Sequence, residues 1–217
     1  MSASRRGMAE LALRRADLYG LLSGVFSSPP SPELLAAVKS GDMEDLARAL
    51  ELPGVPELFR TYRERLAGSP EEAALEELAI DWTRLVRPIG QIKPPYEGLY
   101  RSNPDSGETI LQIKKAYRQS GMLPDESTGE PPDFLGIELD FMRRLCLREH
   151  ECRKSGAGAA ALFSEEESFL REHLGEWVAV FCAGVGDYVT TDFYRAFLRL
   201  LEHFVAEELK FLTGAVS

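Results

Sequence analysis

The sequence predicts an all-α fold with about nine to eleven helices. Apolar residues recur at spacings of three and four over most of the 217-residue chain, which is the period of an amphipathic helix. No segment combines strict apolar alternation with β-branched residues and hairpin turns, as a sheet would require. Clusters of proline and glycine separate the helical stripes, so we expect the helices to be joined by turns and loops.

In the first half of the chain the stripes predict helices over residues 9–26, 32–39, 42–50 and 56–66. The next helix should begin near Ser69, because Ser69 and Glu72 form a Ser-x-x-Glu capping box around Pro70. Such a box satisfies the free backbone amides of a first turn, and proline suits the first helical position. The apolar stripe of this helix continues to Val86.

In the second half we expect helices over residues 107–121 and 133–153. A second capping box, from Ser164 to Glu167, predicts the start of a helix that carries Trp177. The acids at 165–167 would then lie in a first turn, where they interact favourably with the helix dipole, so we interpret them as a solvated helix start. The last long helix should begin near Thr191 or Asp192.

The segment 123–132 contains three prolines and one glycine, which makes it the best candidate for a hinge. It would separate an N-terminal helical half, residues 1–122, from a C-terminal half, residues 133–217. We expect the halves to form one compact domain, because this chain length fits one large domain. The stretch 156–161, rich in Gly and Ala, is interpreted as a mobile loop.

The charge of the chain narrows the classes of partner. Thirty-five acidic and twenty-five basic side chains give a net charge of −10, which repels phosphate backbones and anionic lipid surfaces. We therefore expect no nucleic-acid partner. The same field would favour a cationic ligand such as an arginine-rich peptide, although many proteins are acidic only for solubility. No apolar run approaches the roughly 18 to 20 residues of a membrane span.

The cysteines and the first residues indicate the compartment. Three cysteines without a Cys-x-x-Cys pair argue against a disulfide framework and favour a reducing cytoplasm. The pair Arg5-Arg6 resembles a twin-arginine export signal, but Arg14, Arg15 and Asp17 interrupt the apolar stretch that should follow it. We therefore expect a cytoplasmic protein that is not itself exported.

Signatures of enzymes and metal sites are weak. Each histidine has a leucine where a Glu-x-x-His metal motif needs its acid. Cys146, His150 and Cys152 could approach one another on a helix, but no fourth ligand follows at a regular spacing. The sequence also lacks a phosphate-binding Gly-x-x-x-x-Gly-Lys loop and a Gly-x-Ser-x-Gly elbow. We predict no catalytic residue, no metal and no cofactor.

Two segments have the composition of binding sites. In the first, residues 81–100, a helix end with Trp82 leads into a proline loop that carries Tyr96 and Tyr100. Prolines hold such a loop extended, so its aromatic faces could grip another chain, or they could simply fill the core. In the second, residues 130–142, Asp133 is well placed to cap the helix that follows.

Asp133 has a second interpretation. With Glu138, a little over one turn later, it could offer negative charge to an arginine of a bound peptide.

Together the segments resemble the motifs of the TorD-like family of redox enzyme maturation chaperones, which includes the TorD, DmsD and NarJ types. In the first family motif, an acid and an aromatic residue precede a Leu-Phe pair and a loop of prolines and aromatics. The residues that match it are Asp81, Trp82, Leu85, Pro94, Pro95, Tyr96 and Tyr100. The second motif, Glu-Pro-x-Asp-His before an apolar helix, is matched by Glu130, Pro131, Asp133, Ile137, Leu139, Phe141 and Met142.

The chain departs from the family pattern at three positions. Val86 replaces the usual Phe, Gly98 the usual Ser, and Phe134 the usual His. The last change removes a titratable group, so a pH-sensitive role of that position is not expected here.

The resemblance implies an all-helical, non-enzymatic chaperone of anaerobic respiration. Its partner would be the catalytic subunit of a molybdenum or tungsten oxidoreductase, whose twin-arginine leader it holds in the cytoplasm until the molybdopterin cofactor is inserted. The residues expected to bind the leader peptide are Trp82, Leu85, Val86, Pro94, Pro95, Tyr96, Tyr100, Asp133, Phe134 and Glu138.

Four alternatives stay open. A NarJ-type chaperone would escort a subunit that is not exported, and a helical scaffold would have no chaperone role. A helical enzyme or nucleotide-binding protein would need a bound metal or nucleotide. Exchange of helices about the predicted hinge would give a homodimer.

Overall fold

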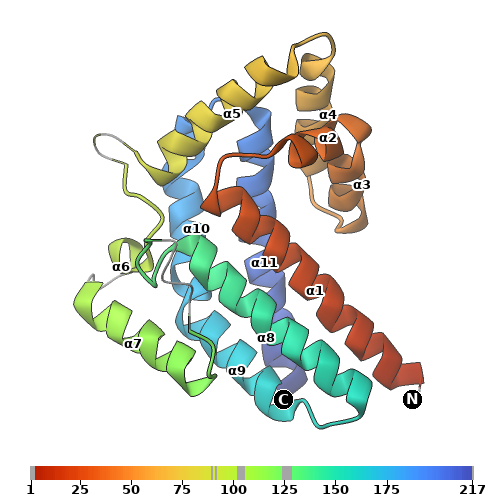
Figure 1. Cartoon of the computed structure of the whole chain (residues 1–217), viewed down its shortest axis with the longest axis vertical. Coiled ribbons are helices and arrows are strands. Elements are labelled where there is room, and N and C mark those ends of the chain that lie inside the picture. Colours follow the sequence, from red (N-terminus) through yellow and green to blue (C-terminus); the bar gives the residue numbers. More distant parts are fainter. Residues whose placement is uncertain (1–2, 89, 91, 102–105, 124–128, 217) are drawn as a thin grey trace. The chain divides into compact units, whose positions relative to one another are not determined.

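Figure 1 shows a computed structural model of the chain, which describes residues 3–88, 90, 92–101, 106–123 and 129–216. Within these residues the regular elements are eleven α-helices and one short 3₁₀ helix. The β-type pairing found there is an isolated bridge between Tyr96 and Phe134. The prediction of an all-α fold is therefore confirmed.

The helices follow one another along the chain. They are α1 (Ala3–Ser27), α2 (Pro32–Ser40), α3 (Asp42–Ala49), α4 (Val55–Leu66), α5 (Glu71–Val86), α6 (Glu97–Tyr100), α7 (Ser106–Gln119), α8 (Leu135–Ser155), α9 (Ala160–Glu172), α10 (Leu174–Val185), the 3₁₀ helix η2 (Gly186–Tyr188) and α11 (Asp192–Val216).

The chain divides into two compact units. Unit 1 comprises Met1–Ser27, Tyr96–Val178 and Val205–Ser217, and unit 2 comprises Ser28–Pro95 and Ala179–Phe204. Residues 124–128 of the predicted hinge lie outside the described residues. The predicted division of the chain at 123–132 stays a prediction.

In unit 1, α1 and α8 pack side by side in opposite directions (Figure 1). Near one end of the pair, His150 Nδ1 lies 2.7 Å from the carbonyl oxygen of Ala9. Near the other end, the Ser23 hydroxyl donates to the carbonyl of Gly136 at 2.8 Å. The two helices approach closely there, because a Cβ atom on Gly136 of α8 would lie 3.2 Å from the Cβ of Ser27 of α1.

A buried ionic cluster joins four helices of unit 1. Arg15 of α1 forms ion pairs with Glu149 of α8 at 2.9 Å, Glu166 of α9 at 2.6 Å and Glu208 of α11 at 2.8 Å. All four side chains are buried. Burial raises the pKa of Glu166 to about 7, although the charge of Arg15 acts in the opposite direction. We call this group the Arg15 cluster.

The Arg15 cluster corrects the interpretation of the acids at 165–167. Helix α9 begins at Ala160, earlier than the capping box predicted, so these acids lie in the middle of the helix. Glu166 falls on the same buried stripe as Phe163 and Phe169. It is therefore an interior residue and not part of a solvated helix start.

Both predicted capping boxes are wrong. The N-cap of α5 is Pro70, without a side-chain hydrogen bond, and Ser164 lies inside α9. The helix predicted to run through Trp177 is also two helices, because the backbone turns at His173 (φ −123°, ψ −96°) between α9 and α10. The apolar stripe continues across this break, which is why the sequence did not reveal it.

Aromatic contacts and the buried acid Asp81 help to hold unit 2 together. The rings of Phe59 and Phe197 lie 5.2 Å apart. The carboxylate of Asp81 accepts the backbone N–H groups of Thr190 at 3.0 Å and Thr191 at 2.7 Å, at the start of α11. Burial alone would raise the pKa of Asp81, but these donors outweigh it and hold the pKa below its ordinary value. Asp81 thus ties α5 to the start of α11.

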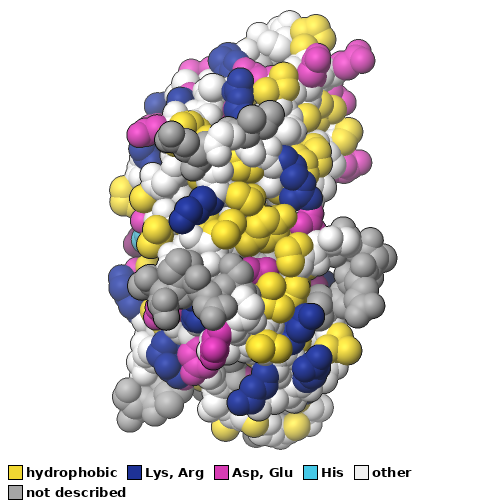
Figure 2. Space-filling view, turned by 90° about the vertical axis from the view of Figure 1, so that its left-hand side faces the viewer, with side chains coloured by type: hydrophobic (Ala, Val, Ile, Leu, Met, Phe, Trp, Pro, Cys, Tyr) yellow, Lys and Arg dark blue, Asp and Glu magenta, His cyan; other side chains and the backbone are white. Residues whose placement is uncertain are grey.

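The surface carries both signs of charge. On the face shown in Figure 2, Lys and Arg side chains lie among acidic and hydrophobic ones. The net charge of −10 therefore does not produce a continuous acidic surface there. Among the described helices, none has the length and apolar character needed to cross a membrane.

Candidate functional site

The second predicted segment meets the short helix α6 at the start of α8, within unit 1. The carbonyl of Asp133 accepts the N–H of Glu97 at 2.9 Å, and its carboxylate Oδ2 accepts the N–H of Gly98 at 3.2 Å. Asp133 therefore caps α6. The prediction that it caps the following helix is wrong, because the N-cap of α8 is Phe134 and Asp133 stands one residue too early.

Three buried acids come together at α6 and the start of α8. Glu97 and Glu138 have no exposed surface, and Asp133 is 3% exposed. Burial raises the pKa of Glu138 well above its ordinary value, and the nearby Glu97 and Asp133 raise it further. Burial also raises the pKa of Asp133, with the Gly98 N–H acting against it. We call Glu97, Asp133 and Glu138 the acid cluster.

Aromatic residues surround the acid cluster. The indole N–H of Trp177 donates to Glu138 Oε2 at 3.3 Å, and the ring of Tyr100 stacks on Trp177 with centroids 5.7 Å apart. The ring of Tyr96 lies 5.7 Å from that of Phe134. The structure thus brings five of the predicted site residues together in unit 1. They are Tyr96, Tyr100, Asp133, Phe134 and Glu138.

Glu97 connects the acid cluster to the surface. Its carboxylate lies 2.7 Å from Nε of Arg101 and 3.0 Å from Nδ1 of His173. Arg101 also donates to Gln112 Oε1 of α7 at 3.1 Å and to the backbone carbonyl of Glu172 at the end of α9. One buried carboxylate therefore fixes α6, α7 and the break between α9 and α10 against one another.

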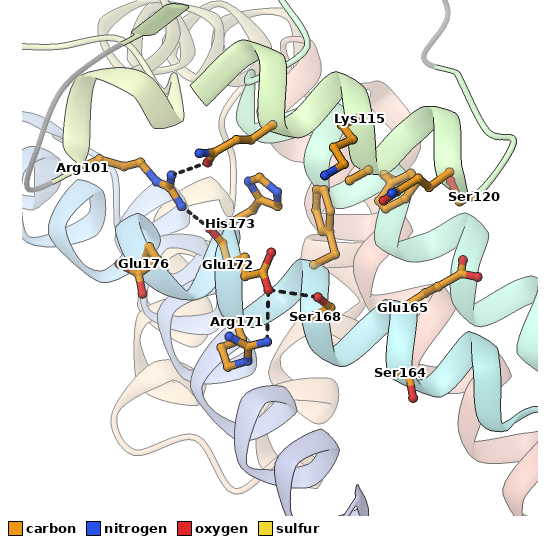
Figure 3. Close-up of a pocket in the computed structure, with 15 residues that line it drawn as sticks. Arg101, Lys115, Ser120, Ser164, Glu165, Ser168, Arg171, Glu172, His173 and Glu176 are labelled. Atoms are coloured by element: carbon orange, nitrogen blue, oxygen red, sulfur yellow. Dashed lines mark hydrogen bonds and ion pairs between the residues drawn. The ribbon is translucent and has the colours of Figure 1, made fainter. Parts of the chain in front are cut away.

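Arg101 and His173 lie in the wall of a pocket of about 660 Å³ in unit 1. Figure 3 shows Arg101 and Glu176 at one end of it and Ser120 and Glu165 at the other. The residues that line it are Arg101, Gln112, Lys115, Ala116, Gln119, Ser120, Phe141, Ser164, Glu165, Ser168, Phe169, Arg171, Glu172, His173 and Glu176. We call it the α7–α9 pocket.

The charged side chains of the α7–α9 pocket differ in their partners. Glu172 accepts the Ser168 hydroxyl and an N–H of Arg171, each at 3.1 Å. In the part of the chain that is described, Lys115 has no ion pair, and Glu165 Oε2 is buried without a hydrogen-bond partner. Among these residues, the pocket therefore contains a cation without an ion pair and one carboxylate oxygen without a hydrogen-bond donor.

The other predicted site residues belong to unit 2. Leu85 and Val86 are buried, whereas Trp82 is half-buried at the end of α5. In the loop that follows, Pro95 is buried and Pro94 half-buried, and residues 89 and 91 lie outside the described residues. That this segment and the acid cluster form one cradle stays a prediction.

Sequence reasoning missed the residues that link the acid cluster to the pocket. Glu97 and Arg101 have the spacing of a helical ion pair, but a helix of four residues is too short to show a period. The sequence excluded His173 only from a Glu-x-x-His metal pair, because Leu170 stands at the position of the acid. Nothing in its local sequence reveals that Glu97, 76 positions earlier, is its partner.

Comparisons with known proteins agree over most of the chain. A family described as "Nitrate reductase delta subunit" matches residues 48–183. The perchlorate reductase assembly chaperone protein of Dechloromonas aromatica is 29% identical over 205 residues, covering 92% of this chain and 90% of that protein. The chaperone protein TorD of Vibrio vulnificus is 26% identical over 208 residues, with 93% and 95% covered. That of Shewanella pealeana is 25% identical over 218 residues, with 94% and 91% covered.

Proposed function

This chain belongs to the nitrate reductase delta subunit family, that of the TorD-like proteins, and on that premise we propose that it is a maturation chaperone of a redox enzyme. The observation that carries the proposal is the match to proteins named as chaperones over about nine-tenths of both chains. The client would be the catalytic subunit of a molybdopterin oxidoreductase, bound in the cytoplasm before its cofactor is inserted.

The segment of the client that we favour is its twin-arginine leader. A leader of this kind joins two arginines to an apolar stretch, so it needs carboxylates beside aromatic surface. The net charge of −10 favours encounter with such a cation. Trp82, Tyr96 and Tyr100 each keep part of their surface exposed, and they are the apolar contacts that we propose.

The other predicted residues would support these aromatic contacts from the interior. Leu85, Val86, Pro95 and Phe134 are buried and would hold the aromatic side chains in place. Asp133 and Glu138 are buried too, and their carboxylates would shape the site through α6 and Trp177.

The proposal is tested by co-purification of the tagged protein from its native host under anaerobic growth. The expected result is enrichment of a molybdopterin oxidoreductase subunit, identified by mass spectrometry, relative to an unrelated acidic helical bait. Equal recovery with both baits would contradict the proposal.

The family name gives one specific alternative for the client. A nitrate reductase type of chaperone would bind a subunit that has no leader. A captured subunit whose gene encodes no twin-arginine leader would favour this alternative, whereas loss of capture after deletion of the leader would favour the leader-binding proposal.

A further inference from the structure

We propose that the α7–α9 pocket binds a short extended segment of the client that carries an arginine, with Glu165 as the partner of the guanidinium. The inference rests on the proposed function and adds a site to it. The acids that the sequence suggested for this contact, Asp133 and Glu138, are 3% and 0% exposed. Carboxylates of Glu165, Glu172 and Glu176 instead line the pocket, whose wall also includes Arg101 and His173, the partners of the acid cluster.

The walls of the pocket are fixed before any ligand binds. Glu97 is completely buried and holds both Arg101 and His173. Arg101 in turn bonds to Gln112 of α7 and to the backbone of α9. Because these contacts set the separation of the two walls, a ligand does not need to order them, which favours binding.

Helix α7 presents to the pocket a face that suits a polypeptide backbone. Its interior face carries the buried residues Thr109, Ile113 and Tyr117. Its pocket face instead carries Gln119, whose amide can donate and accept hydrogen bonds. Gln112 also lines this face, but its amide already bonds to Arg101 and Glu108. An extended peptide offers one N–H and one C=O per residue, so the amide of Gln119 can satisfy part of it.

The acids of the pocket indicate that the ligand carries a basic side chain. Among the described residues, neither Glu165 nor Glu176 forms an ion pair, and Glu165 Oε2 is removed from water without a donor. A buried acceptor normally has a hydrogen-bond partner, and a guanidinium supplies several donors in a plane. Lys115 is the one cation of the lining without an ion pair there, and it would bond a backbone carbonyl of the ligand.

Three ring side chains of the lining form a buried apolar wall. Phe141 is 4% exposed, and Phe169 and His173 are each 3% exposed. The rings of Phe141 and Phe169 lie 4.5 Å apart, and His173 lies 4.6 Å from Phe169. The arrangement therefore combines an apolar wall beside which the methylene stem of a basic side chain can lie with a carboxylate for its charge.

The test uses the full-length protein and a synthetic peptide with two consecutive arginines followed by apolar residues. Its affinity is measured by isothermal titration calorimetry for wild type, Glu165→Gln and a matched control, Glu10→Gln, which removes an exposed charge of unit 1 outside the pocket. We expect Glu165→Gln to weaken binding by about five- to tenfold and Glu10→Gln to change it by less than about twofold.

Two further measurements make the assignment specific. Gln119→Trp, at an exposed lining position, should fill the pocket and abolish binding without disturbing the core. With a peptide whose arginines are replaced by glutamine, the difference between wild type and Glu165→Gln should disappear. Circular dichroism and thermal unfolding confirm that each variant is folded.

The outcomes separate this inference from the proposed function. If wild type binds the peptide and both pocket variants bind it as tightly as the control, the pocket assignment is wrong while leader binding stands. If wild type does not bind the peptide, both the leader-binding proposal and this site are wrong. Capture of the client by Glu165→Gln at wild-type level in the co-purification would also count against the site.

Discussion

At the scale of single residues, Asp133 is an acid of the family motif whose carboxylate is buried beneath the protein surface. Its carboxylate accepts the Gly98 N–H and so holds α6, from which Glu97 reaches Arg101 and His173. Asp133 is therefore positioned to affect binding through the geometry of α6. A direct contact with an arginine would make its charge the important property instead.

Two substitutions at Asp133 distinguish these roles. Asp133→Ala removes the cap of α6, so we expect a loss of about 1 kcal/mol in the free energy of unfolding and weaker binding of a twin-arginine peptide. Asp133→Asn keeps an oxygen that can accept the Gly98 N–H, so both properties should stay near wild type. If Asp133→Asn instead weakens binding as much as Asp133→Ala and lessens its salt dependence, the charge itself contacts the peptide.

The buried carboxyl group of Glu166 should make the free energy of unfolding of the protein depend on pH. Burial raises its pKa from 4.5 to about 7 in the folded protein, so between these values the folded state holds a proton that the unfolded chain releases. The free energy of unfolding should therefore fall as pH rises from 5 to 8, by up to about 3 kcal/mol from this group. Urea unfolding at pH 5, 6, 7 and 8 measures it.

Glu166→Gln should flatten this dependence, because glutamine does not titrate. Glu167→Gln, which changes the neighbouring acid that pairs with Arg171, is the matched control and should keep the wild-type slope. An unchanged slope in Glu166→Gln would assign the pH dependence to other groups, such as Glu138 and Glu208, whose pKa values burial also raises.

At the scale of elements, the contact of α1 with α8 depends on a glycine. A Cβ atom on Gly136 would lie 2.9 Å from Phe134 Cε1 and 3.2 Å from Ser27 Cβ. Phe134 is buried and cannot move away easily. We therefore expect Gly136→Ala to lower the free energy of unfolding by about 1–3 kcal/mol.

Gly24 of α1 provides the control for Gly136. A Cβ atom there meets nothing within 4 Å, and alanine favours the helix, so Gly24→Ala should stabilise the protein by about 0.5–1 kcal/mol. Equilibrium urea unfolding of both variants measures the two effects. Stabilisation by Gly136→Ala would mean that α1 and α8 do not approach closely.

The tie between α5 and α11 in unit 2 gives a second prediction at this scale. Asp81→Asn loses one of the two oxygens that accept from Thr190 and Thr191, so we expect a loss of about 1–3 kcal/mol in the free energy of unfolding at pH 7. Because the pKa of Asp81 is lowered, the wild-type advantage should shrink as pH falls below about 4.

Asp187→Asn, at an exposed acid of the same unit, is the control for Asp81→Asn and should change stability little. Equal stability of Asp81→Asn and wild type by denaturant unfolding at pH 7 would show that the tie contributes nothing.

The sequence predicted a helix where the helix is long enough to show an apolar period. The sequence predicted a helix at 32–39 and another from near Thr191 or Asp192, and the structure has α2 at Pro32–Ser40 and α11 at Asp192–Val216. The four-residue α6 is too short for a period. The break at His173 lacks a proline, so the pattern did not show it. The two helix starts predicted from capping boxes were wrong, because a Ser-x-x-Glu pattern is common and caps only where the backbone permits.

At the scale of the whole molecule, the site could be predicted only in part. The resemblance selected Tyr96, Tyr100 and Asp133, which the structure brings together in unit 1. It did not reveal that the acids are interior, because Asp and Glu are mostly exposed in proteins. Nor could it find the α7–α9 pocket, whose walls come from helices that share no motif.

The Arg15 cluster also has a consequence for biosynthesis. Arg15 and its partner Glu208 are 193 residues apart, so at roughly 5–20 residues per second a ribosome needs about 10–40 s between making one and the other. During that interval Arg15 of the first helix lacks at least one of the buried carboxylates that pair with it in the folded protein. Unit 1 therefore cannot close while it is being translated, and a protein that assists the assembly of another must itself finish folding after synthesis.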